Sequence, residues 1–99
     1  MRLLWRNINQ TRNRLQMIKP VLEQSELDDL GFNFKGRLPL DNKDFFRWWS
    51  FRKNDSEIHI TYEFNSKNEF ISGYVDFNCE KLKGRQITKE DIKLLIEIM

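Results

Sequence analysis

The chain contains no alanine among its 99 residues, and it has only one cysteine, one histidine and four glycines. Because Cys79 is the only cysteine, no internal disulfide can form, which is typical of a protein of the reducing cytosol. One histidine and one cysteine do not provide the spacing of a zinc site, and the isolated glycines do not form a phosphate-binding loop. No apolar run approaches the ~20 residues that cross a bilayer, and the charged start is unlike a secretory signal. We therefore expect a cytoplasmic protein with no membrane span.

The abundant residues indicate a folded domain with an uneven distribution of charge. Asparagine, lysine and isoleucine each occur nine times and phenylalanine eight times. Their codons are rich in A and T, as is common in small genes of mobile bacterial elements. Hydrophobic residues make up 39%, which is enough for a single domain over residues 1–99 to bury a core. The net charge is +2, but residues 1–22 carry +5, whereas residues 23–29 and 57–80 carry −4 each. Such blocks are either ordinary solvated faces or surfaces that orient a partner.

The first thirty residues have the pattern of an amphipathic helix. One stripe of side chains recurs at alternating spacings of four and three: Leu4, Ile8, Thr11, Leu15, Ile18 and Leu22. Pro20 should kink or divide this helix, and Gly31 should end it. Residues 1–9 could instead form an extended arm.

The middle of the chain has strand patterns separated by turn signals. Residues 31–35 are a candidate short strand, and residues 36–43 have the composition of a loop. Residues 44–53 are rich in aromatic side chains, and residues 57–64 alternate strictly between polar and apolar. With Asn54-Asp55 between them, these two segments predict a β-hairpin.

The last third of the chain predicts one more strand and a closing helix. A turn over residues 65–68 leads to a strand over residues 69–79, in which Gly73 is expected to mark a bulge. Residues 81–85 form a loop, and Thr88 is a candidate N-cap. The helix that follows presents one apolar face, made by Ile92, Leu95, Ile96 and Met99.

This element order predicts an α+β fold. We expect a two-layer sandwich with an N-terminal helical segment, a three- or four-stranded antiparallel meander and a C-terminal helix. Strand alternation assigns one set of side chains to the core: Phe45, Trp49, Phe51, Ile58, Ile60, Tyr62, Phe64, Ile71, Val75, Phe77 and Cys79. The opposite set faces outward: Phe46, Trp48, Ser50, Arg52, Glu57, His59, Thr61, Glu63, Phe70, Ser72, Tyr74 and Asp76.

The outward set mixes aromatic side chains with carboxylates, which is the composition of a protein–protein hot spot. The candidate partner-binding residues are Phe46, Trp48, Glu57, His59, Glu63, Tyr74 and Asp76. Three alternatives remain open. The N-terminal helix could cover this face and give a three-layer domain, a second copy could cover it in a homodimer, or the strand register could differ.

His59 is the one residue that suggests catalysis. It shares a strand face with Glu57 and Glu63, so it could act as a general acid or base, for example in a small ribonuclease. Nothing else in the sequence completes such a site, and Cys79 is expected to point inward as a small apolar residue. We therefore expect a protein that is not an enzyme and has no catalytic residue, no metal and no cofactor.

A nucleic-acid-binding accessory protein of phage type is the second class of function. Its phosphate contacts would come from the basic first segment, through Arg2, Arg6, Arg12 and Arg14, with Lys19. Residues 72–77 resemble the aromatic strand motif of RNA-recognition-motif domains. The chain departs from that motif because the leading basic residue is missing, Asp76 intrudes, and no helix separates the strands.

The leading interpretation is a small protein that binds and masks another protein. In size, composition and layout the chain is similar to immunity proteins of contact-dependent inhibition and colicin-type systems. That similarity implies a toxin as the partner, with Trp48 and Tyr74 as anchors and with Glu57, Glu63 and Asp76 pairing with basic groups of the toxin.

Overall fold

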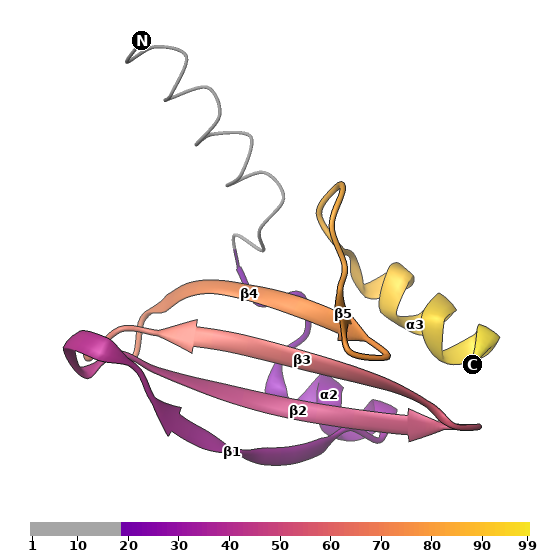
Figure 1. The fold of residues 1–99 in the computed structure, drawn as a ribbon, viewed down its shortest axis with the longest axis horizontal. Coiled ribbons are helices and arrows are strands. Elements are labelled where there is room, and N and C mark those ends of the chain that lie inside the picture. Colours follow the sequence, from indigo (N-terminus) through magenta and orange to yellow (C-terminus); the bar gives the residue numbers. More distant parts are fainter. Residues whose placement is uncertain (1–18) are drawn as a thin grey trace, which may run out of the picture.

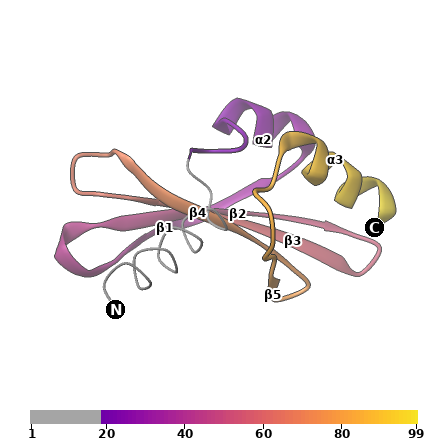
Figure 2. The same cartoon turned by 90° about the horizontal axis from the view of Figure 1, so that it is seen from above.

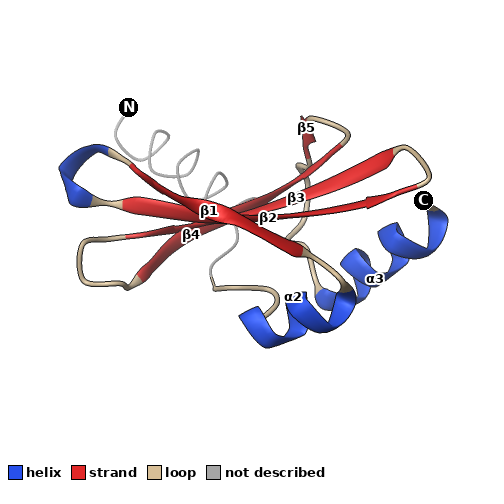
Figure 3. Ribbon diagram, turned by 90° about the horizontal axis from the view of Figure 1, so that it is seen from below, coloured by secondary structure: helices blue, strands red, loops and turns tan. Residues whose placement is uncertain are grey.

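The computed structural model describes residues 19–99, so the predicted helix and the basic side chains of residues 1–18 lie outside the described residues. The fold is α+β, with two helices and a five-stranded antiparallel sheet whose strands follow chain order (Figure 1). In sequence the elements are α2 (Gln24–Leu30), β1 (Asn33–Pro39), the 3₁₀ turn η1 (Asp41–Lys43), β2 (Phe45–Lys53), β3 (Ser56–Phe64), β4 (Phe70–Phe77), β5 (Glu80–Lys81) and α3 (Lys89–Ile98). Both helices lie on one face of the sheet, over the end that contains the β2–β3 turn (Figures 2 and 3).

The central hairpin forms as its sequence predicts. Lys53 pairs with Ser56, and the two residues between them, Asn54 and Asp55, have φ angles of 50° and 67°. Positive φ at both positions is the signature of a type I′ turn, whose twist matches that of the strands. A second turn of this kind, with Asn78 at φ 51° and Cys79 at φ 71°, joins β4 to β5. The predicted strand over residues 69–79 therefore ends at Phe77, and the fifth strand was missed.

The first strand is longer than its sequence predicts. It runs from Asn33 to Pro39 instead of ending at Lys35, so part of the predicted loop is strand. A register shift between Phe34 and Gly36 accommodates Lys35 as an extra residue, and Gly36 has a φ of 145°. Because β1 pairs only with β2 among the described strands, Pro39 can sit in it without removing a ladder hydrogen bond.

Most of the predicted core is confirmed. Ile58, Ile60 and Tyr62 of β3 are buried, with Trp49 of β2 and Val75 of β4 beside them. The helices add further buried residues to the same cluster, namely Leu22, Leu27, Phe32 and Ile92. The predicted apolar face of α3 is confirmed as well, since Leu95, Ile96 and Met99 pack against this cluster.

Three expectations for β4 are wrong, and one bulge explains two of them. Glu63 pairs with Ser72, but the next residue, Phe64, pairs with Phe70, so Ile71 is the extra residue. Phe70 therefore packs against the core and Ile71 is 48% exposed, the reverse of the predicted alternation. The bulge also lies at Ile71 rather than at Gly73. Cys79 is exposed because it belongs to the β4–β5 turn and not to a strand.

The helix ends are capped as the sequence indicates. Gly31, at φ 96°, ends α2, and its N–H donates to the Asp28 carbonyl. Such a left-handed position favours glycine. Thr88 caps α3 by accepting from the N–H of Asp91, while the Asp91 carboxylate accepts from the N–H of Thr88. At the other end of α3, Lys53 Nζ donates to the Ile96 carbonyl at 2.9 Å, so the helix is tied to β2.

Candidate protein-binding face

The strand register brings the seven predicted partner-binding residues onto one face of the sheet, opposite the helices. Across β2, β3 and β4, Trp48 lies opposite Thr61, which lies opposite Tyr74. We use the term outer face for the side chains that this register gathers: Phe46, Trp48, Ser50, Arg52, Glu57, His59, Thr61, Glu63, Ser72, Tyr74 and Asp76. In the described part of the chain, no helix lies on this face (Figure 2).

His59 lies on the middle strand of the outer face and contacts a side chain of its own strand and one of β2. Its Nε2 lies 2.6 Å from Oε1 of Glu57, and its ring meets the Trp48 ring edge-on, with the centroids 5.2 Å apart. In the register its cross-strand neighbours are Ser50 and Asp76. The imidazole is thus held between a carboxylate and an aromatic ring. No group of His, Cys, Asp and Glu residues within residues 19–99 has the geometry to hold a metal ion.

The carboxylates of the outer face differ in how far they are engaged. Glu63 Oε1 accepts a hydrogen bond from the Ser72 hydroxyl at 3.1 Å. Glu57 also has Arg52 beside it, with Nε 3.6 Å from Oε2, but the Arg52 side chain is 72% exposed and this pair adds little stability. The acidic groups therefore retain acceptor capacity for basic groups of a partner.

Tyr74 is the aromatic residue at the β4 end of the outer face. Burial raises the pKa of its phenol, and a hydrogen bond with Thr61 acts in the opposite direction. Lys81 Nζ lies 4.3 Å from the centroid of the Tyr74 ring, so a cation packs on this ring. Sequence reasoning missed Lys81 because it comes from β5, and only the weak turn signal of Asn78 precedes that strand.

One residue that the sequence assigns to this face does not contribute to it. Phe70 points into the core because of the Ile71 bulge. The predicted nucleic-acid contacts Arg2, Arg6, Arg12 and Arg14 lie outside the described residues.

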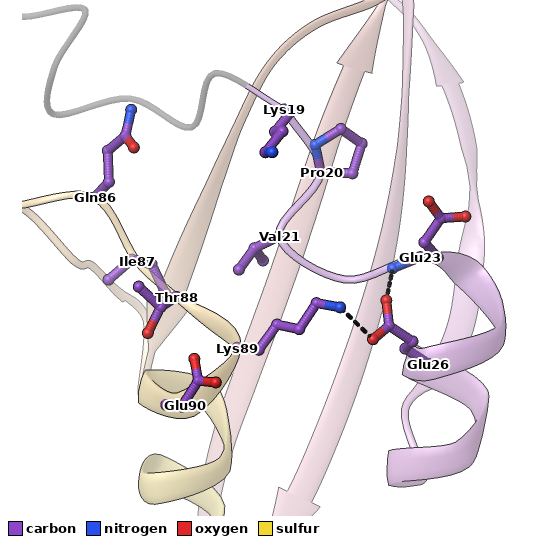
Figure 4. A pocket seen from close by; sticks show the side chains of 10 residues that line it. All are labelled: Lys19, Pro20, Val21, Glu23, Glu26, Gln86, Ile87, Thr88, Lys89 and Glu90. Carbon is purple, nitrogen blue, oxygen red and sulfur yellow. Dashed lines mark hydrogen bonds and ion pairs between the residues drawn. The ribbon is translucent and has the colours of Figure 1, made fainter.

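A cleft of about 460 Å³ lies between the first turns of α2 and α3, on the other side of the sheet (Figure 4). Lys89 Nζ reaches across it to Glu26 Oε2 at 2.7 Å, and Glu26 Oε1 accepts from the N–H of Glu23 at 2.9 Å. Both contacts lower the pKa of the Glu26 carboxyl, and the hydrogen bond from the Glu23 backbone has the larger effect. The chain's own ion pair thus spans the cleft and joins the two helices, which favours a structural role.

No protein-family model matches this chain, and neither a curated protein nor a solved structure matches it. The helices of the described residues lack the length and apolar character that crossing a membrane requires.

Proposed function

We propose that the protein is a non-catalytic binding protein that masks a cognate protein with the outer face of its sheet. The observation that carries the proposal is the convergence of Phe46, Trp48 and Tyr74 with three carboxylates on the face that neither described helix covers. Large aromatic side chains surrounded by polar groups are what protein–protein hot spots contain. The most specific form of the proposal is an immunity protein that neutralises a toxin.

Trp48 and Tyr74 serve as anchors in this proposal. Thr61 lies between them in the register, so the two rings project from strands that are about 10 Å apart at the usual strand spacing. Two anchors at that separation can fill two neighbouring apolar pockets of a partner. The buried Thr61 lies between them.

Glu57, Glu63 and Asp76 set the charge that the partner must complement. They belong to β3 and β4 and surround the central row of Trp48, Thr61 and Tyr74. A partner with lysine or arginine side chains around an apolar centre fits this pattern, since charge complementarity speeds association and excludes wrong partners. Masking then follows if those basic groups belong to the toxin's own active site or target-binding surface.

The experiment that tests the proposal is a pull-down from native lysate with the tagged full chain, with and without nuclease. The decisive variant combines Trp48→Ala, Glu63→Gln and Asp76→Asn, which removes one anchor and two charges of the outer face. A matched control combines Leu94→Ala, Glu90→Gln and Glu97→Gln, which makes the same kind of change on exposed positions of α3.

We expect the wild-type chain and the control to retain one stoichiometric protein partner after nuclease treatment, and the outer-face variant to lose it. If the partner is a toxin, co-expression of the wild-type chain or the control restores growth, whereas the outer-face variant does not. Retention of the partner by the outer-face variant, or loss of every partner after nuclease treatment, contradicts the proposal.

A further inference from the structure

The helix-side face of the sheet has a second distinctive region at the end farthest from α2 and α3 (Figure 3). Arg37 of β1 and Arg47 of β2 lie directly opposite each other there. The guanidinium carbon of Arg37 lies 3.9 Å from the centroid of the Phe45 ring, and that of Arg47 lies 5.7 Å from the same centroid. Phe45 is only 3% exposed although no described helix lies over this end, so the arginines form part of its cover.

The charges of these two arginines are not neutralised within the described chain. Among residues 19–99, neither guanidinium forms a salt bridge or a hydrogen bond with a carboxylate, in contrast to Arg85, which pairs with Asp91. Like charges directly opposite each other on neighbouring strands destabilise a sheet. An anionic ligand between the two guanidinium groups would offset this repulsion.

A cleft adjoins the arginine pair and adds another cation. It has a volume of about 320 Å³ and is lined by Arg37, Pro39, Lys43, Asp44 and Phe45. Asp44 is the one acid of this lining, so Arg37 and Lys43, with Arg47 beside them, leave the region positive. Guanidinium groups bind phosphate oxygens in planar, bidentate geometry, which suits a ligand that carries phosphates.

The same side of β1 also presents an exposed aromatic ring. Phe34 pairs with Trp49 and Arg37 pairs with Arg47, so Phe34 and Arg37 point to the same face of the sheet. The Phe34 ring is 51% exposed and packs on Trp49, with the ring centroids 5.3 Å apart. Unpaired bases stack on exposed aromatic rings of strands, and neighbouring guanidinium groups assist such binding.

We propose that Phe34, Arg37 and Arg47 form a binding surface for single-stranded nucleic acid. The two guanidinium groups contact phosphates, and the exposed face of the Phe34 ring stacks on a base. An acidic protein segment would use the charges, but every nucleotide of a single strand carries a flat base beside its phosphate, so the exposed aromatic favours nucleic acid. This surface lies on the opposite side of the sheet from the outer face, and it uses none of the arginines of residues 1–18.

The test measures binding of a fluorescently labelled single-stranded RNA of twelve uridines to the full chain, by anisotropy over a range of salt concentrations. The double variant Arg37→Gln/Arg47→Gln is compared with the double variant Lys83→Gln/Lys93→Gln, which removes the same charge at exposed positions away from both surfaces. We expect the first pair to weaken binding at least tenfold and to lower the slope of log affinity against log salt by about 1.4, from about 0.7 per phosphate contact. The control pair is expected to weaken binding less than threefold.

Phe34→Leu tests the stacking contact separately, because leucine keeps apolar cover for Trp49 but has no ring. We expect it to weaken binding of the RNA about fivefold or more and to leave binding of an abasic strand of the same length unchanged. Equal effects of the arginine pair and the control pair, or no RNA binding by the wild-type chain, overturn the proposal. Displacement of the RNA by a polyglutamate peptide of equal charge, at equal concentration, also overturns it in favour of an acidic protein partner. None of these results bears on the outer face, whose partner is tested with different variants.

Discussion

The hydroxyl of Tyr62 is expected to be one of the most important single atoms for the stability of this fold. It donates a hydrogen bond to the Leu22 carbonyl at 2.7 Å and accepts one from the Leu22 N–H at 3.1 Å. Tyr62 and Leu22 are both buried, at 3% and 1% exposure. The hydroxyl thus satisfies both backbone groups of the residue that leads into α2, and it joins that segment to the central strand.

Tyr62→Phe keeps the ring and removes only this hydroxyl. Each buried backbone group left without a partner costs about 1–3 kcal/mol, so we expect the loss of both partners to lower the free energy of unfolding by about 2 kcal/mol or more. A domain of this size is stabilised by about 5–15 kcal/mol in total, so the variant should still fold. Its melting temperature should drop by about 8 °C or more, at roughly 4–8 °C per kcal/mol.

The assay is urea unfolding followed by tryptophan fluorescence, with thermal unfolding as a second measurement. Tyr74→Phe is the matched control, because its phenol lies half-buried on the outer face and its loss should cost less than about 1 kcal/mol. If Tyr62→Phe unfolds within about 0.5 kcal/mol of the wild-type chain, with an unchanged dependence on urea, the reasoning is refuted. Leu22 would then have other partners for its backbone groups.

Four further predictions follow from turns, caps and pKa shifts. Burial raises the pKa of Tyr62 to about 12, so the folded state keeps a proton that the unfolded state releases near pH 10. The Tyr62 phenol should therefore lower the free energy of unfolding by about 2–3 kcal/mol between pH 10 and 12 in urea titrations, and the fall should be smaller by that amount in Tyr62→Phe. Asp55→Gly should stabilise the β2–β3 hairpin by about 0.5–1 kcal/mol in thermal unfolding, because Asp55 has a φ of 67° and glycine suits that conformation without strain. Thr88→Ala should cost about 1 kcal/mol by removing the cap of α3. Because Arg85 holds the pKa of Asp91 well below its ordinary value, stability should be lost below about pH 4, and Asp91→Asn should flatten that loss in acid titrations.

The parts of the fold that the sequence predicts well are those where local and tertiary preferences agree. Residues 57–64 alternate without interruption, and Asn54-Asp55 supplies a turn of the right twist, so both strand and register follow. Gly31 and Thr88 are likewise confirmed as helix boundaries, because their roles depend on backbone geometry within one turn of the chain.

The errors arise where tertiary context overrides composition. Gly36 and Pro39 indicate a loop, but an edge strand tolerates both a bulge and a missing N–H. The bulge at Ile71 reverses the alternation of the first residues of β4, and nothing in a period-two pattern indicates where such an extra residue falls. The arginine pair was missed for a different reason. Arg37 and Arg47 have the composition of ordinary surface residues, and only the pairing of β1 with β2 places them together over Phe45.

The candidate face was easier to predict than the arginine pair because it depends on three adjacent strands of regular register. Trp48, Thr61 and Tyr74 align across β2, β3 and β4, where the register is unbroken. The face that the described helices cover carries apolar side chains, whereas the outer face carries the three carboxylates. The alternation alone does not specify protein binding, because the same pattern would suit a homodimer interface or a face covered by an additional layer.

The net charge of +2 conceals a separation of charge between the two sides of the sheet. Glu57, Glu63 and Asp76 lie on the outer face, whereas Arg37 and Arg47 lie on the helix side, at the end that α2 and α3 leave uncovered. The two groups project in opposite directions from the sheet, and at physiological ionic strength charges are screened over about 8 Å. The two proposed ligands, a basic partner and a polyanion, would therefore be attracted to opposite sides, with little mutual cancellation. The orientation in which either ligand approaches is thus determined by strand alternation, which assigns the acids and the arginines to opposite faces.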